Sequence, residues 1–226
     1  MDSVHRAEPP GGQIHHTDPF ATPEGQRSPI RRFRGRLAAP VTLWTAYARP
    51  AAGETAPPAA TQTARAAGQT ALLTAGQAAS AAGETASPAA GEPADPAGLT
   101  VSSTLVADGD PPRLLGLVDE ESDLWAAASA SGRFAVALLG PAHRRLADRF
   151  AGLFPAPGGL FATGEWTRTP YGPVPADAGG WAGCRLDGFR AYGWALLVEA
   201  TIETVELTGD AVPLLHHRGR YRELAG

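Results

Sequence analysis

The chain has 226 residues, of which 43% are hydrophobic and 19% are charged, so its length permits one domain with additional tails. The formal net charge of −4 at pH 7 gives no indication of a nucleic-acid partner. The single cysteine excludes an internal disulfide, and the chain has neither a signal-peptide core nor the roughly 18-residue apolar run of a membrane span, so we expect a cytoplasmic protein without a membrane partner.

Residues 1–29 combine prolines, glycines and scattered charges without a hydrophobic period, which predicts a disordered tail. His5, His15 and His16 fall in this segment. No cysteine or carboxylate set of ligand spacing accompanies them, so we expect solvated side chains and no metal site.

The arginine-rich segment 30–37 is expected to form a short helix, because Ile30, Phe33 and Leu37 recur at helical spacing. Its arginines would cover the outer face, either as solvated side chains whose stems lie over the core or as a contact to a phosphate. They are Arg31, Arg32, Arg34 and Arg36. Residues 41–47 follow, and their β-branched and aromatic side chains predict a strand.

Residues 49–97 consist mostly of Ala, Gly, Thr, Pro, Gln and Glu, with similar sequences at 51–60 and 81–90. Such a composition cannot bury enough apolar surface to offset an ordering entropy of about 1–2 kcal/mol per residue. We therefore expect a low-complexity loop that interrupts one domain spanning residues 30–226. Loop-closure entropy grows only logarithmically with length, so a sheet can carry this insertion.

The stretch 98–119 organises the rest of the chain and is expected to form two strands around a turn. Thr100, Ser102 and Ser103 place small hydroxyls in the first strand, and the segment 108–112, Asp-Gly-Asp-Pro-Pro, breaks it. Hydroxyl and backbone donors beside a turn suit an anionic ligand or one with many acceptors. The alternative, a Ser/Thr-rich strand that binds nothing, stays open.

Short helices and further strands are expected after this stretch. Ser122 can cap a helix over 123–129 that ends at Gly132. Pro141 suits the first position of the next helix, on which Leu146, Ala147 and Phe150 share one face. We expect strands at 133–139, 181–189, 190–207 and 211–217, and a proline-rich loop at 160–180. That loop would cover a pocket or pack on a second subunit.

Cys184 lies in an apolar strand context, where a buried, inert thiol is expected rather than a nucleophile.

Several segments together resemble the flavin reductase-like, FMN-binding split β-barrels. The first is Thr100-Val101-Ser102-Ser103 followed by Asp110-Pro111-Pro112 and an apolar strand. Residues 134–139, 146–151 and 213–222 resemble the next core strand, the following helix and the closing segment, in the family's order. The match covers roughly residues 30–48 and 98–226. It implies a mainly β fold with a few short helices, built as a Greek-key-like antiparallel barrel.

The resemblance also implies a flavin reductase-like oxidoreductase that moves hydride from NADH or NADPH to FMN, with FAD as a possible substrate. It implies a homodimer with the flavin near the interface and a partner monooxygenase. Thr100, Val101 and Ser102 would line the flavin ring, and Ser102, Ser103 and Arg149 would hold its phosphate. Arg218 and Arg220 are a second source of positive charge. The alternative for Arg149 is a surface ion pair with a neighbouring acid, and the alternative for Arg218 and Arg220 is a solvated side chain.

Two positions depart from the family pattern. Tyr192-Gly193-Trp194 stands where reductases of the family commonly carry Gly-Asp-His, so Trp194 takes the histidine position, and Ala137 stands where relatives often have Asn. An indole can stack on a ring but cannot replace the donor and acceptor of an imidazole. Two alternative functions therefore stay open: a split barrel that binds flavin, deazaflavin or haem without oxidising nicotinamide, and a scaffold whose working part is the insertion.

Overall fold

A computed structural model describes residues 28–48, 95–209 and 211–224 of the chain. The predicted tail, apart from its last residues, and nearly all of the predicted low-complexity insertion lie outside the described residues. The insertion ends earlier than predicted, because a strand already begins at Pro96.

The described chain is mainly β with three short α-helices, as predicted. The helices are α1 (Pro29–Arg36), α2 (Asp123–Ser131) and α3 (Arg144–Phe150), the last preceded by a 3-10 turn at Pro141–His143. The strands are β1 (Ala39–Pro40), β2 (Thr42–Tyr47), β3 (Pro96–Val101), β4 (Leu105–Ala107), β5 (Arg113–Val118), β6 (Arg133–Leu138), β7 (Trp166–Thr169), β8 (Gly172–Pro175), β9 (Gly180–Tyr192), β10 (Ala195–Leu207), β11 (Leu215–His217) and β12 (Arg220–Arg222). No helix among these elements is long and apolar enough to cross a membrane.

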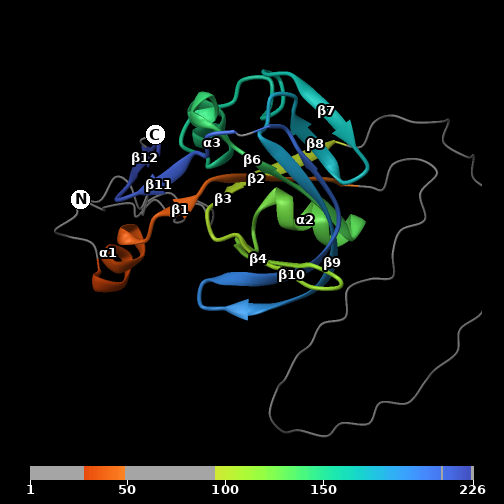
Figure 1. The fold of residues 1–226 in the computed structure, drawn as a ribbon, viewed down its shortest axis with the longest axis horizontal. Coiled ribbons are helices and arrows are strands. Elements are labelled where there is room, and N and C mark those ends of the chain that lie inside the picture. Colours follow the sequence, from red (N-terminus) through yellow and green to blue (C-terminus); the bar gives the residue numbers. More distant parts are fainter. Residues whose placement is uncertain (1–27, 49–94, 210, 225–226) are drawn as a thin grey trace, which may run out of the picture.

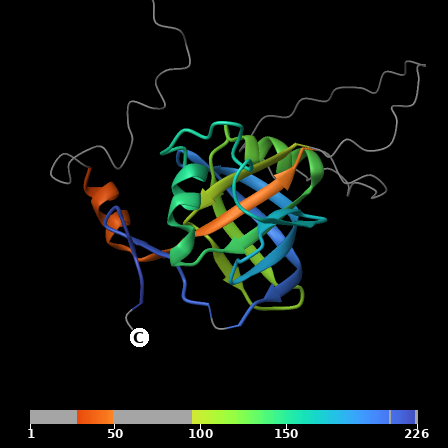
Figure 2. The ribbon, with the colours of Figure 1, turned by 90° about the horizontal axis from the view of Figure 1, so that it is seen from above.

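The main sheet has seven antiparallel strands in the order β3-β2-β6-β9-β10-β5-β4. It curls into a barrel, which Figure 2 shows from above. β2 and β3 pair directly although residues 48–95 lie between them. Trp44 stacks on Phe134 inside the barrel at 4.8 Å between ring centroids, together with Leu114 and Leu124. A second core lies outside the sheet, where Leu43 of β2 and Phe150 of α3 are buried.

The helix α2 forms as its sequence predicts. The Ser122 hydroxyl accepts a hydrogen bond from the Trp125 backbone N–H at 3.2 Å, which caps the first turn. Gly132 ends the helix in the left-handed conformation, with φ of 71°. The helix runs two residues beyond the predicted end, since Ser131 still lies within it.

Four predictions about the strands are wrong in detail. The predicted loop 160–180 contains the hairpin β7–β8, whose proline-bearing strand pairs on one side only, where a missing N–H is tolerated. The predicted strand 190–207 is split by a turn at Gly193. The sequence concealed this turn, because the alternation of apolar and polar residues keeps the same phase on both sides of it. The stretch 98–119 holds three strands, since β4 was missed. The closing segment forms the hairpin β11–β12 rather than one strand over 211–217.

The elements α1, β1, β11 and β12 form a projection beside the barrel that we call the arm (Figures 1 and 2). Its small sheet has the order β1-β11-β12. The Arg218 backbone N–H donates to the Gly35 carbonyl at 2.7 Å, which fixes the β11–β12 turn on α1. The Tyr221 hydroxyl donates to Asp148 of α3 at 2.6 Å, which fixes the arm to the barrel.

Candidate functional site

The hydroxyl-rich segment after β3 is held mainly by its own hydroxyls. Thr100 Oγ1 donates to the Ala147 carbonyl of α3 at 2.7 Å. Ser103 Oγ accepts from the Leu117 N–H at 2.9 Å and donates to the Leu117 carbonyl at 3.1 Å, which joins the two sides of the barrel. The side chain of Ser102 is exposed, and no hydrogen bond to a described residue holds it. Ser102 is therefore the hydroxyl of this segment that stays available to a ligand.

A buried network supports this segment from below. Thr42 Oγ1 donates to the Val101 carbonyl at 2.7 Å and lies 2.9 Å from Thr104 Oγ1. The Trp44 indole N–H reaches both threonine hydroxyls, at 3.1 and 3.2 Å. Because both ends of the segment are tied to β2, the backbone around Ser102 is fixed before any ligand arrives.

The turn between β9 and β10 lies at the same end of the barrel. Leu117, the partner of Ser103, pairs with Leu197 of β10, three residues after Trp194. The side chain of Trp194 is fully exposed, with a relative accessibility of 105%. Figure 1 shows this hairpin reaching the side of the barrel that carries α1. The turn that carries Trp194 therefore begins three residues along β10 from the residue that pairs with the Ser103 partner.

The loop between β5 and α2 gives this end of the barrel negative charge. It carries Asp119, Glu120 and Glu121 directly after the strand that holds Leu117, and Asp123 begins α2. Carboxylates stabilise a helix N-terminus, but they also repel a phosphate that would otherwise bind there. A phosphate bound near these carboxylates would need cations from elsewhere.

Arg149 lies apart from this segment. It faces a cavity of about 430 Å³ between α3, the loop at 163–166 and the residues after β8, and donates a hydrogen bond to Thr163. No residue from 100 to 104 lines the cavity. The structure therefore does not bring Arg149 to Ser102 and Ser103, because the helix turns its side chain toward β7 and β8.

A histidine–aspartate pair, missed by the sequence analysis, forms one wall of this cavity. His143 Nδ1 accepts from the Gly140 N–H at 3.0 Å, which leaves the proton on Nε2, 2.9 Å from Asp177 Oδ1. The hydrogen bond from His143 lowers the pKa of the Asp177 carboxyl below its ordinary value. No local motif marks the pair, since its members lie in elements 34 residues apart.

Arg218 and Arg220 belong to the arm. Asp148, which binds Tyr221 of β12, and Arg149, which faces the cavity, lie on different sides of α3. Arg149 is thus separated by a helix from the arginines that were predicted to act with it. Arg218 and Arg220 are exposed, and neither forms an ion pair with a described residue.

The remaining candidates are core residues. Ala137 is fully buried in the core under α3 and presents no polar atom to a ligand. Cys184 is buried as predicted, and burial together with the nearby carboxylates of Glu203 and Asp187 raises the pKa of its thiol to about 12. A thiol with that pKa is not a nucleophile at neutral pH.

Comparison with known proteins identifies the family. The sequence model of the flavin reductase-like domain matches residues 34–225. The chain belongs to the flavin reductase-like family. Its fold agrees, because nitrilotriacetate monooxygenase component B from Mycobacterium thermoresistibile superposes with a TM-score of 0.61 at 20% identity, covering 87% of this chain and 85% of that one. The NADH:FAD oxidoreductase SgcE6 of Streptomyces globisporus superposes with a TM-score of 0.61 at 18% identity, covering 91% of each chain.

Flavin reductase-like relatives with higher identity match a shorter region. The FMN reductase (NADH) RutF of Methylorubrum extorquens is 36% identical over 115 residues, which are 50% of this chain and 56% of that protein. The RutF of Variovorax paradoxus is 30% identical over 117 residues, 51% of this chain and 64% of that protein. The chain therefore spans little more than half the length of these curated relatives.

Proposed function

We propose that this flavin reductase-like protein oxidises a nicotinamide nucleotide and passes the hydride to FMN. Its family membership carries the proposal, together with the relatives named as NADH-dependent FMN reductases. The end of the barrel at Ser102 and Trp194 supports it, because an exposed hydroxyl and an exposed indole lie beside a rigid backbone. FMN is the proposed flavin, and FAD is a second possible substrate.

The chain's own groups would bind and orient rather than transfer protons. Backbone and side-chain groups from Thr100 to Ser103 would line one edge of the flavin ring, and the indole of Trp194 would pack on a ring face. When bound, the flavin supplies the atom that accepts hydride, so no acid or base from the protein is required. The acidic loop at 119–123 would keep phosphate groups away from the ring end.

Partners are part of the proposal. We propose a homodimer with the flavin near its interface. Exposed apolar side chains on the arm and the barrel end support it, including Phe33 of α1 and Val106 of β4. A monooxygenase that consumes reduced flavin is the proposed downstream partner, since one structural neighbour is itself a monooxygenase component.

A flavin titration followed by a turnover assay tests the function. We expect purified protein to quench FMN fluorescence on binding and to oxidise NADH in the presence of FMN well above the free-flavin background. Ser102→Ala should weaken FMN binding. The matched control is Ser129→Ala, which removes an exposed hydroxyl from α2. FMN-dependent oxidation no faster than background would refute the proposal.

The second candidate is a flavin, deazaflavin or haem protein without nicotinamide turnover. The turn at Gly193 and Trp194 favours it, because no imidazole is present there. This candidate predicts a rise in melting temperature with at least one of the three ligands and no oxidation of NADH or NADPH.

A further inference from the structure

The arm concentrates arginines that form no ion pair within the described part of the chain. α1 carries four arginines and has no buried residue, and the β11–β12 hairpin adds Arg218, Arg220 and Arg222. Several arginines elsewhere in the described chain are paired: Arg113 pairs with Asp187 at 3.1 Å and Arg185 pairs with Glu203 at 3.2 Å. No arginine of the arm makes an ion pair with a described residue. This concentration occurs in a protein whose net charge is −4.

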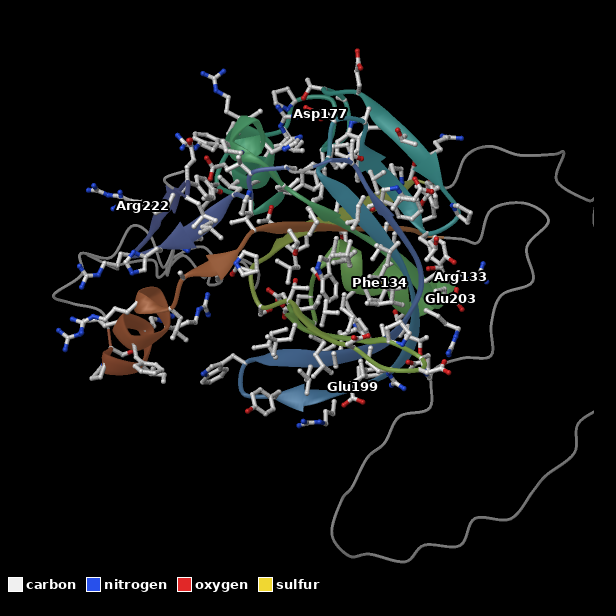
Figure 3. All side chains as sticks on the ribbon, in the orientation of Figure 1. Arg133, Phe134, Asp177, Glu199, Glu203 and Arg222 are labelled. Atoms are coloured by element: carbon white, nitrogen blue, oxygen red, sulfur yellow. The ribbon has the colours of Figure 1, made fainter. Side chains whose placement is uncertain are left out.

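The strand register places Arg220 and Arg222 on one face of the β11–β12 hairpin, together with His217. His216 lies opposite Tyr221, and both rings face α3, where the Tyr221 hydroxyl binds Asp148. His217 lies opposite Arg220 on the other face, and Arg222 follows on the same face because side chains alternate along a strand. Figure 3 shows Arg222 at the outer edge of the arm.

Arg218 occupies a backbone conformation that an arginine rarely adopts. Its φ is 53°, and it is the one non-glycine residue with positive φ in the described part of the chain. It forms a two-residue hairpin turn with Gly219, whose φ is 75°. Asn, Asp or Gly normally fills the position of Arg218 in such a turn. Strained backbone conformations occur often at functional sites. The arginine at this strained position therefore suggests that its positive charge binds a ligand.

The arm stands directly beside the candidate site. β1 ends at Pro40, and Thr42 at the start of β2 already donates to the Val101 carbonyl. The acidic loop at 119–123 follows directly after β5, the strand that holds the Ser103 partner Leu117. The charge distribution thus directs the anionic part of a bound nucleotide away from that loop and toward the arm.

Resting on the proposed function, we propose that the arm binds the phosphate groups of the nicotinamide dinucleotide and prefers NADPH to NADH. The guanidinium of arginine offers paired donors that match phosphate oxygens. The dinucleotide carries a diphosphate, and NADPH adds a 2′-phosphate at the end remote from nicotinamide. Arg218, Arg220 and Arg222 are the residues that would contact these groups, with the arginines of α1 adding to the positive field.

Calorimetric titration of the full chain with NADP⁺ and NAD⁺ tests this assignment without turnover. We expect NADP⁺ to bind about tenfold more tightly, with an affinity that falls as salt is raised. Arg218→Gly should weaken NADP⁺ binding several-fold while leaving the melting temperature unchanged or higher, because glycine relieves the strained turn. Arg220→Gln combined with Arg222→Gln should weaken it about tenfold. The matched control is Arg168→Gln, an exposed arginine of β7, which should change nothing.

Equal affinity for the two nucleotides, or arm variants that bind NADP⁺ as the wild type does, would overturn the assignment. A parallel assay of FMN-dependent NADH and NADPH oxidation distinguishes failure of the arm inference from failure of the reductase function. If the wild type and the arm variants reduce FMN at the same rate from either donor, the arm inference fails and the reductase function stands. If the wild type neither binds nor oxidises either nucleotide, the function itself fails and the inference fails with it.

Discussion

Ser103 and Leu117 exchange a pair of hydrogen bonds, because the serine hydroxyl accepts from the leucine N–H at 2.9 Å and donates to its carbonyl at 3.1 Å. Just after the end of β3, the Ser103 side chain thus takes the place of a neighbouring strand's backbone in pairing with Leu117 of β5. Thr42 fixes the same segment from the other side through the Val101 carbonyl. Ser103 therefore supports the segment, whereas Ser102 is the residue that can contact a ligand.

Ser103→Ala should destabilise the protein by about 1 kcal/mol, since both Leu117 groups lose a partner but remain near water. Ser102→Ala should leave stability within about 0.5 kcal/mol and weaken FMN binding instead. Urea unfolding and FMN fluorescence titration on the same preparations measure the two effects. Loss of stability in Ser102→Ala with none in Ser103→Ala would contradict this division of roles.

Trp194→His should increase FMN-dependent NADH oxidation, because an imidazole offers a donor and an acceptor that the indole lacks. Stability should change little, since the side chain is fully exposed on a turn. Trp194→Phe is the matched control, because it keeps an aromatic face and adds no polar atom. The measurement is the initial rate of NADH oxidation above the free-flavin background. A histidine variant no faster than the phenylalanine variant would argue against a role for this position.

Much of the fold could be predicted from local signals. The cap at Ser122 and the left-handed Gly132 define α2. Apolar residues at helical spacing predicted α1, although Ile30 and Phe33 stay exposed there. The turn at Gly193 was missed for a physical reason: strands on both sides alternate in phase, so periodicity alone shows one long strand. The hairpin β7–β8 was missed because Pro173 and Pro175 are poor strand residues, although an edge strand tolerates them.

The site was predictable only where its residues are contiguous. Thr100 to Ser103 form one segment, so the resemblance located them together. Arg149 shares a helix with Ala147, which binds Thr100, yet its side chain points away from that segment. A shift of one or two positions along a helix changes the side on which a side chain lies. An alignment to distant relatives does not fix the position of Arg149 that closely. The pair His143 and Asp177 depends on tertiary packing alone.

The Asp177 carboxylate should make stability depend on acid pH. Its pKa is lowered, first by the hydrogen bond from His143, so the folded state favours the ionised form. A lowered pKa contributes stability that is fully present above the ordinary value of 3.8 and is lost as pH falls through the folded value. The contribution is small, because the Asp177 side chain is 74% exposed.

Asp177→Asn should therefore lower the urea midpoint at pH 7 and have progressively less effect as the pH is brought below 4. Glu165→Gln, which removes an exposed carboxylate from the same cavity, is the control. If the difference in urea midpoint between wild type and Asp177→Asn instead grew toward acid pH, the ionised Asp177 carboxylate would not be the source of the stabilisation.

Gly116→Ala should test whether the barrel interior transmits strain to the site. A Cβ at Gly116 would lie 2.5 Å from Cη2 and 2.7 Å from Cζ2 of Trp44, whose ring is confined by Phe134 at 4.8 Å. Overpacking of this kind costs about 1–3 kcal/mol. The Trp44 indole N–H binds Thr104, so a displaced ring also disturbs the segment that carries Ser102.

We accordingly expect Gly116→Ala to lower both the free energy of unfolding and the affinity for FMN. Gly35→Ala is the control, since nothing lies within 4 Å of a Cβ at that position and alanine favours α1. Urea unfolding and FMN titration measured at a temperature where the variant is fully folded separate a binding defect from simple unfolding. Unchanged FMN affinity in a folded, destabilised Gly116→Ala protein would show that the Trp44–Thr104 contact does not shape the binding end of the barrel.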